Sequence, residues 1–372
     1  MSARRKPKVL EFFAGGGLAR IGLSEHFDTI WSNDIDPQKA SAWIANFGPA
    51  GFVLGDVHQL DPATLPHGDL AWASFPCQDL SLAGARAGLE AHRSSSFYGF
   101  SDVIKGLKSL GRAPKILVIE NVSGLLTSHK GRDFETLLRA LNDLGYQAGA
   151  LEIDARHFVS QSRPRVFIIA CAQNFTIPAS LHMRVPAASP FLSPTLLKAI
   201  ETLPSDLRAN YIWWYLPPPP KTPLTLIDLI DTTDKNWWPQ GKTDALISSL
   251  NSRHHAKLVA IQATNTPHVG AIYRRTRTVN GQRRVYAEIR FDGLAGCLRT
   301  PSGGSSRQFL LFVQGNQILA RALNAREAMR LMGVPDTYVL PKSPSSGLKI
   351  AGDGVVVPVV AWLSQHLLSK LV

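Results

Sequence analysis

Short apolar runs alternate with segments of helical periodicity from Lys8 to Ala170. Seven of these runs are short and bounded by turn residues, which predicts strands. The predicted strands are Val9–Phe13, Thr29–Trp31, Gly51–Leu54, Asp69–Ser74, Ile116–Glu120, Tyr146–Ile153 and Val166–Ala170. The predicted helices between them are Leu18–His26, Pro37–Phe47, Phe97–Leu110 and Phe134–Leu144. Because strands and helices alternate, we expect an α/β fold with a doubly wound sheet.

The pattern changes after about Ala172, where the regular alternation ends. Prolines cluster at Pro217–Pro220, and tryptophan pairs occur at Trp213-Trp214 and Trp237-Trp238. We interpret residues 175–318 as a smaller, irregular domain that contains β-structure. A pair of long surface insertions is the alternative.

Helical periodicity returns near the end of the chain, at Ala325–Met332 and Val357–Leu371. We therefore expect residues 319–372 to pack back on a first domain formed by residues 1–174. A chain of 372 residues is long enough for one large and one smaller domain.

Polar residues stand at the ends of three predicted strands. Cys77 lies in the turn Ser74–Gln78, Glu120 ends the run that begins at Ile116, and Gln161–Arg165 precedes Val166–Ala170. Ligand crevices of open α/β sheets form at strand ends, so these groups indicate a site. A free cysteine by itself is more often a small buried apolar residue.

The net charge of +12 favours a polyanionic partner, because phosphates neutralise surplus Lys and Arg. Three cysteines, Cys77, Cys171 and Cys297, are too few and too scattered for a disulfide framework or a metal site. The basic start lacks the apolar region of a signal peptide, and no apolar stretch is long enough to span a bilayer. We expect a cytoplasmic protein.

Six motifs in order along the chain resemble those of the C5-cytosine-specific DNA methyltransferase family of bacterial or phage type. They are Phe13–Gly17, Pro76-Cys77-Gln78, Glu120-Asn121-Val122, Gln161–Arg165, Leu323–Gly333 and Ala351–Val355. The resemblance implies a Rossmann-like methyltransferase sheet that binds S-adenosylmethionine, with residues 175–318 as the target-recognition domain.

The cofactor prediction rests on a glycine-rich turn after the first strand, which lets the backbone approach a ligand. Asp34 is the candidate for the ribose hydroxyls; by resemblance Asp56 accepts from the adenine amino group, and Phe13 and Ile35 enclose the ring. The other predicted contacts are Ala14, Gly15, Gly17, Pro76, Asp353 and Val355. For both aspartates a helix N-cap or turn role is the alternative.

The sequence departs from the family pattern at two of these places. Leu18 stands where a glycine is commoner, and Asp353-Gly354 replaces Asn-Ser or Asn-Ala.

The resemblance assigns covalent catalysis to Cys77, which adds to C6 of cytosine and so makes C5 nucleophilic. Glu120 and Arg165 suit a protonated carboxyl at N3 and a cation at O2, and burial is one way to keep such a carboxyl protonated. Arg163 is a further catalytic candidate that promotes loss of the thiol proton, with a structural salt bridge as the alternative.

A ring stacked in a duplex cannot be attacked on its face, so the target base must be flipped out. The segment Gln78–Arg93 has the glycine content and polarity of a lid that contacts DNA through Gln78, Ser81 and Arg93; an ordinary surface loop is the alternative.

Arginines are dense between Tyr273 and Arg307, which suits phosphate contacts and guanine readout. The predicted DNA contacts are Arg274, Arg275, Arg277, Arg283, Arg284, Arg290, Arg299, Gly303, Gly304 and Arg307. A solvated charged face is the alternative. We expect Trp213, Trp214 and Tyr215 to belong to the core.

We expect a monomer that acts on double-stranded DNA, with a possible cognate restriction endonuclease acting separately. An RNA cytosine-5 methyltransferase and a catalytically inactive DNA-binding homologue are the alternatives left open.

Overall fold

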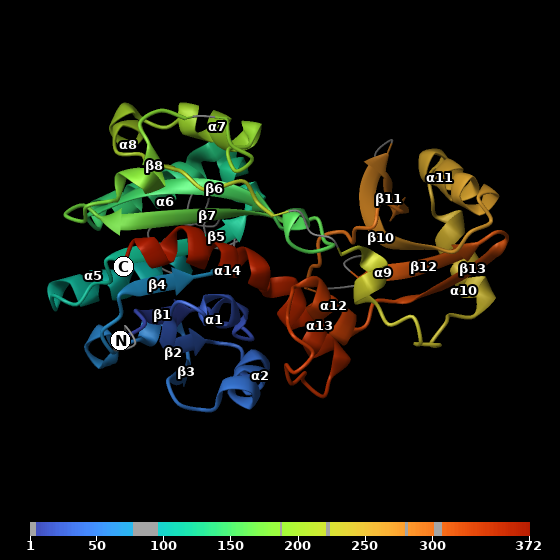
Figure 1. The fold of residues 1–372 in the computed structure, drawn as a ribbon, viewed down its shortest axis with the longest axis horizontal. Helices are drawn as coiled ribbons and strands as arrows, with labels where there is room; N and C mark the ends of the chain where they lie inside the picture. The colour runs from blue at the N-terminus through green and yellow to red at the C-terminus, as the bar shows by residue number, and fades with distance from the viewer. Residues whose placement is uncertain (1–4, 77–95, 187, 221–223, 280–281, 301–306) are drawn as a thin grey trace. The chain divides into compact units, whose positions relative to one another are not determined.

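The computed structural model describes residues 5–76, 96–186, 188–220, 224–279, 282–300 and 307–372, without the side chains of Arg277, Val279 and Arg283. The chain divides into two compact units (Figure 1). Unit 1 comprises Met1–Asp154, Pro164–Pro219 and Val359–Val372, and unit 2 comprises Ala155–Arg163 and Pro220–Pro358.

Unit 1 is built on a seven-stranded sheet with the order β3-β2-β1-β4-β5-β7-β6. Its strands are β1 (Lys8–Phe12), β2 (Asp28–Asp34), β3 (Phe52–Leu54), β4 (Leu70–Ala73), β5 (Ile116–Val122), β6 (Tyr146–Asp154) and β7 (Pro164–Ala172). β7 runs antiparallel to both of its neighbours, whereas the pairs from β3 to β5 are parallel. The predicted doubly wound α/β sheet is confirmed, with each predicted strand within a few residues of its observed bounds.

The helices of unit 1 lie where the periodicity predicts them. They are α1 (Leu18–Leu23), α2 (Pro37–Phe47), α5 (Ser96–Ser109) and α6 (Arg132–Asp143), with α14 (Val357–His366) near the end of the chain. One apolar cluster joins side chains of β1, β4 and β5 to those of α5 and α6. Burying this large continuous core is the main contribution to the stability of the unit.

The chain from 175 to 219 belongs to unit 1, although the sequence places it with the irregular region. It contains β8 (His182–Met183), α7 (Pro194–Glu201), α8 (Ser205–Ala209) and β9 (Trp213–Trp214). Trp214 is 1 % exposed and donates to the carbonyl of Gly149, and Trp213 is half-buried, whereas Tyr215 is exposed. The chain leaves unit 1 in the proline run Pro217–Pro220.

Unit 2 contains a four-stranded antiparallel sheet with the order β11-β10-β12-β13. The strands are β10 (His268–Val279), β11 (Gln282–Arg290), β12 (Gln308–Gln314) and β13 (Gln317–Ala322). The helices are α9 (Leu226–Leu229), α10 (Gln240–Ser248), α11 (Ser252–Ala263), α12 (Ala325–Leu331) and α13 (Pro344–Asp353). Side chains of α10 and α11 share one apolar cluster with the sheet.

A buried ion pair fixes the start of α12. Both oxygens of Glu327 accept from Arg321, at 2.6 and 2.9 Å, and both residues are almost fully buried. Glu327 also accepts from the amide of Asn324, whose side chain accepts in return from the amide of Glu327. This capping box orients the helix, and the shared carboxylate holds the buried arginine.

The prediction that no apolar stretch is long enough to span a bilayer is wrong. The helical stretch Pro344–Lys370 is long and apolar enough to cross a membrane by length and composition. However, 61 % of its apolar window is buried inside the protein, and α13 ends before α14 begins. The core helix of a soluble protein passes the same test, so we interpret the stretch as core.

Candidate active site

The turn between β1 and α1 has a backbone that demands glycine. Phe13, Gly15 and Gly17 all have positive φ, at 57°, 56° and 78°. A Cβ on Gly17 would meet the ring of Phe47 and lie 2.9 Å from Cδ1 of Trp43. The chain can therefore pass into α1 only with a glycine at this position.

Asp34 lies at the carboxyl end of β2 and faces this turn. Its carboxylate accepts from the amides of Gly15 and Asp36, each at 2.8 Å. Two amides leave part of the acceptor capacity of a carboxylate unused. The N-cap of α2 is Asp36, so the N-cap role considered for Asp34 belongs to its neighbour, whereas the bond from the amide of Asp36 gives Asp34 a turn role.

Two further predicted cofactor residues lie on the same edge of the sheet. Ile35 is 65 % exposed, which is unusual for an isoleucine and leaves an apolar surface next to Asp34. Asp56 is the N-cap of the short helix Val57–Gln59 and accepts from the amide of His58 at 3.0 Å. The turn role considered for Asp56 is therefore present.

Glu11, which the sequence reasoning missed, is buried beneath the glycine turn. It accepts from the hydroxyl of Ser32 at 3.0 Å and from the amide of Arg20 at 3.3 Å. Burial raises the pKa of Glu11 to about 7, although the bond from Ser32 opposes this shift. A lone carboxylate inside the apolar run Val9–Phe13 was the signal that could have identified it.

We expect Glu11 to make stability depend on pH. Its pKa is about 7 in the fold against an ordinary value of 4.5, so the folded state binds the proton more tightly. This contribution is fully present below pH 4.5 and is lost as the pH rises through 7, on the order of 3 kcal/mol. Urea unfolding from pH 5 to 8 should show a smaller loss for Glu11→Gln than for the wild type.

The matched control for this measurement is Glu25→Gln, because the side chain of Glu25 is 78 % exposed. That variant should follow the wild-type pH dependence. Identical curves for Glu11→Gln and the wild type would contradict the expected role of Glu11.

The segment that carries the predicted nucleophile begins at the end of β4. The side-chain amide of Asn121 donates to the carbonyl of Phe75 at 3.2 Å, which ties this segment to the end of β5. Phe75 is buried and Pro76 is exposed. The predicted residues Cys77, Gln78, Ser81 and Arg93 lie outside the described residues.

Burial raises the pKa of Cys171 to about 12, so this thiol stays protonated at neutral pH. Because the thiolate is the nucleophilic form, Cys171 is unsuited to attack a substrate.

Glu120 and Arg165 meet at the carboxyl end of β5. Nε of Arg165 lies 3.1 Å from Oε1 of Glu120, and the exposed fractions of the two side chains are 14 % and 7 %. β7 begins beside the end of β5, with Val122 and Arg165 in register. The antiparallel entry of β7 is therefore what brings the arginine to the carboxylate.

Arg163 is held within unit 2 by backbone carbonyls. Its guanidinium donates to the carbonyls of Leu298, Gly352 and Gly354 at 2.6 to 2.8 Å, and its side chain is 2 % exposed. Gln161, two residues earlier in the sequence, is also fully buried. Its side chain donates to the carbonyl of Leu331 and accepts from the amide of Leu298. These contacts favour a structural role for Arg163, through carbonyls instead of the salt bridge that was considered.

Asp353 and Val355 also belong to unit 2. Asp353 is exposed and accepts from the hydroxyl of Thr300, and Val355 is buried. A Cβ on Gly352 would lie 2.5 Å from the carbonyl carbon of Arg299. The end of α13 thus packs closely against residues 299–300, which only glycine permits.

The arginine-rich region forms the hairpin of β10 and β11. Arg277 pairs in register with Arg284, and Arg275 pairs with Tyr286. Arg275 and Arg284 are exposed, with Arg275 lying 3.9 Å from Glu288, while Arg274 is half-buried over the ring of Phe309. Arg283 also belongs to β11.

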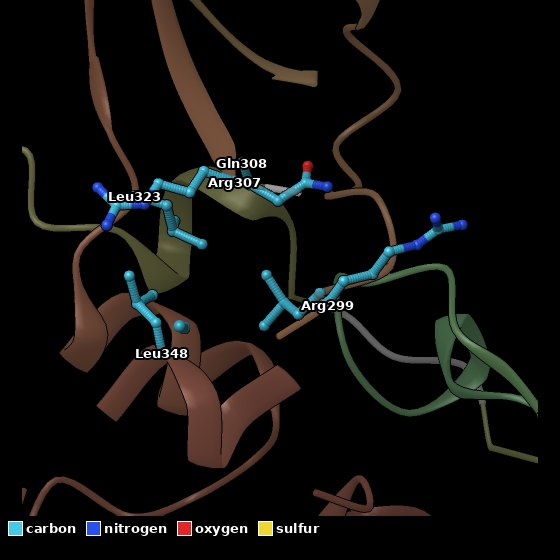
Figure 2. A pocket seen from close by; sticks show the side chains of 7 residues that line it. Arg299, Arg307, Gln308, Leu323 and Leu348 are labelled. Atoms are coloured by element: carbon cyan, nitrogen blue, oxygen red, sulfur yellow. The ribbon is translucent and has the colours of Figure 1, made fainter. Parts of the chain in front are cut away.

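The other predicted DNA contacts follow the hairpin. Arg290 is paired with Asp292, with N–O distances of 2.6 and 2.7 Å. Arg299 and Arg307 are exposed and extend in opposite directions from a small pocket (Figure 2). Gly303 and Gly304 stand between them in the sequence and lie outside the described residues. At about 20 Å³ the pocket has room for about one water molecule, so it cannot hold a base.

The family model of the C-5 cytosine-specific DNA methylases matches residues 7–369. The chain belongs to this family. It is therefore a DNA cytosine-5 methyltransferase.

Several Type II methyltransferases are similar to this family member over most of their length. M1.ScrFI of Lactococcus lactis subsp. cremoris is 26 % identical, covering 98 % of this chain and 79 % of the relative. M.HpaII of Haemophilus parainfluenzae is 28 % identical, covering 99 % of this chain and 91 % of the relative. M.HhaI of Haemophilus parahaemolyticus is 24 % identical, covering 98 % and 95 %.

Solved structures share the methyltransferase fold. A Spodoptera frugiperda DNMT2 variant has a TM-score of 0.63 at 16 % identity, covering 98 % of this chain and 99 % of that one. The S. pombe Dnmt2 methyltransferase has a TM-score of 0.56 at 18 % identity, covering 99 % and 98 %.

Proposed function

We propose that this DNA cytosine-5 methyltransferase acts on a flipped cytosine through a covalent bond between Cys77 and C6. The observation that carries the proposal is the Glu120–Arg165 pair, with 3.1 Å between Nε and Oε1, at the end of the strand next to the cysteine turn. Cytosine presents an amino donor and two acceptors, N3 and O2, on one edge. A protonated carboxyl beside a guanidinium matches that edge, whereas thymine offers a donor at N3.

The chemistry assigns one task to each group. The thiolate of Cys77 adds to C6, and its electron pair moves through the ring toward N3 and C5. Glu120 gives its proton to N3, and the guanidinium of Arg165 stabilises the negative charge that develops at O2. After C5 has gained the methyl group, a base takes the proton from C5 and the S–C6 bond breaks, which releases Cys77 as a thiolate. The proton on N3 returns to the carboxylate of Glu120, and the aromatic ring is restored.

The residues of unit 1 fit S-adenosylmethionine, which when bound supplies an electrophilic methyl group. Asp34 retains acceptor capacity for ribose hydroxyls after binding two amides. The exposed face of Ile35 suits an adenine ring, with Phe13 as the second predicted contact. Ala14, Gly15, Gly17 and Asp56 lie in the turns at the same edge of the sheet. Pro76 of unit 1 and Asp353 and Val355 of unit 2 stay predicted contacts.

DNA that carries 5-fluorocytosine at the target position tests the covalent step, because fluorine cannot leave C5 as a proton does. Incubation with S-adenosylmethionine should yield a protein–DNA adduct, and peptide mass spectrometry should locate it at Cys77. An adduct at Cys297 would overturn the proposal. The absence of an adduct would also overturn it, if the protein methylates the same DNA with ordinary cytosine at the target position. Parallel incorporation assays with duplex DNA and tRNA distinguish the RNA alternative.

Replacing Asp34 with Ala should weaken S-adenosylmethionine binding by roughly 10- to 100-fold. Hydrogen bonds to a charged group contribute about 1.5–3 kcal/mol, which corresponds to this range. Titration calorimetry measures the affinity, and thermal unfolding without the cofactor reports any damage to the glycine turn. Asp61→Ala is the control. Asp61 is an aspartate that caps a short helix, and it is not among the predicted cofactor contacts. Unchanged affinity in Asp34→Ala would remove Asp34 from the site.

We further propose that the hairpin of β10 and β11 binds the phosphates of duplex DNA. Arg277 and Arg284 are paired across the two strands, and like charges at paired positions destabilise a sheet unless an anion lies near them. Arg275 shares the face of Arg277 and Arg284, because side chains two residues apart lie on the same face of a strand. Arg274 and Arg283 stand one residue out of step with this pair and stay predicted contacts. The base readers are then expected between Arg290 and Arg307.

Replacing both Arg275 and Arg284 with Gln should weaken binding to all duplex sequences alike. The slope of log K against log salt should become shallower by about 0.9 for each phosphate that the protein no longer neutralises. Fluorescence anisotropy from 50 to 300 mM salt measures the slope. Arg253→Gln, an exposed arginine at the start of α11, is the control. A change of sequence preference with an unchanged slope would contradict the phosphate role.

The proposed partners follow from this function. The protein acts on double-stranded DNA as a monomer in the cytoplasm, and a separate restriction endonuclease would recognise the same sequence. The similarity to Type II methyltransferases supports the endonuclease.

A further inference from the structure

We propose that the amino edge of the unit 1 sheet binds the phosphates of a second segment of duplex DNA. A cavity of about 630 Å³ lies at this edge, with Arg5, Lys6, Lys8, Lys115 and Lys370 among its lining residues. A neighbouring hollow of about 340 Å³ shares Arg5 and Lys6 and adds Arg20. We call this surface the amino-edge groove.

The amino-edge groove is far from the proposed active site within the same unit. Lys8 begins β1, and Lys115 directly precedes β5. The glycine turn and Glu120 lie at the opposite ends of these strands. Strands of five to seven residues separate the two edges by about 16–23 Å, so one phosphate group cannot contact both.

The charge of the groove is strongly unbalanced. Six Lys and Arg side chains line it, and its carboxylates are Asp28 and Asp69. Asp69 already accepts from the amide of Lys8 at 2.8 Å. Among the described residues, no carboxylate lies within ion-pair distance of the Lys115 or Lys370 ammonium groups. Such a surplus attracts a polyanion.

The shape of the groove favours a duplex over a small anion. Its lining residues come from the starts of β2, β1, β4 and β5, which is about 14 Å of sheet edge at the usual strand spacing, with Lys8 at β1 and Lys115 at β5. The lysines at its rim are exposed rather than buried donors converging on one point. Duplex DNA carries one charge per about 1.7 Å of axis, so a single segment can meet several of these cations.

In Figure 1 the first described residues and the last residues of the chain lie on the side of unit 1 where β1 starts. Arg5–Lys8 and Lys370–Val372 line the same cavity.

A protein that holds one duplex at its active site and another at this groove could move between DNA segments without full release.

A bridging assay tests the proposal. The protein is bound to a biotinylated duplex on beads, and a fluorescent duplex without a target cytosine is then added. The wild type should capture the second duplex, and three phosphate contacts would weaken capture about 40-fold between 50 and 200 mM salt. The triple variant Lys6→Gln, Lys115→Gln, Lys370→Gln should lose capture while it methylates a short duplex at the wild-type rate.

The matched control carries the same charge change elsewhere on unit 1, as Lys105→Gln, Lys130→Gln and Lys198→Gln, all exposed. Capture by the control should equal that of the wild type. Equal capture by both triple variants, or none by the wild type, would overturn the proposal. Displacement of the second duplex by inorganic phosphate at matched ionic strength would instead identify a small-anion site and also overturn it.

Discussion

Cys77→Ser should abolish methyl transfer, with a residual rate below about one ten-thousandth of the wild type. A serine hydroxyl is not ionised at neutral pH and is a far weaker nucleophile than a thiolate, so the addition to C6 is lost. Transfer of labelled methyl groups to DNA measures the rate. The same variant should form no adduct with 5-fluorocytosine DNA.

Binding measurements separate this loss from misfolding. Affinities for S-adenosylmethionine and for DNA should stay near those of the wild type, because only the covalent step is removed. Cys171→Ser is the comparison: Cys171 is buried in β7, so this change should affect stability rather than the mechanism. Normal turnover by Cys77→Ser would refute covalent catalysis at this position.

Glu120→Gln should lower kcat by roughly two to four orders of magnitude, the usual range for one acid–base or electrostatic partner. The amide keeps the shape of the side chain but cannot give a proton to N3. It also replaces the carboxyl group that contacts Arg165. Single-turnover methylation at saturating DNA measures the chemical step, and DNA affinity should change little.

Arg165→Lys provides a second test of this pair. Lysine keeps the positive charge but loses the planar guanidinium, so its rate should fall between those of the wild type and Glu120→Gln. Glu201→Gln, an exposed change on α7, controls for preparation effects. A Glu120→Gln variant with normal kcat and weakened DNA affinity would assign Glu120 to binding alone.

The sheet could be predicted because its strands are local apolar runs, and their turn residues mark the ends. The placement of Glu120 beside Arg165 was also within reach, since both residues stand at strand ends that share one edge. The partners of Arg163 were not, because they lie 135 to 191 residues away along the chain. No local pattern in the sequence indicates contacts of that range. The motif Gln161–Arg165 therefore did not show that Arg165 contacts a carboxyl group while Arg163 binds backbone carbonyls.

The contacts of Arg163 have a consequence for the evolution of new specificities. Gln161 and Arg163 bind Leu298, and the amide of Ser162 donates to Ala295. A recombination that replaced the chain through residue 298 would have to reproduce these bonds with a foreign backbone. The bonded groups at Ala295 and Leu298 are main-chain atoms, so a segment that brings new base readers must keep the backbone course here, while its side chains can differ.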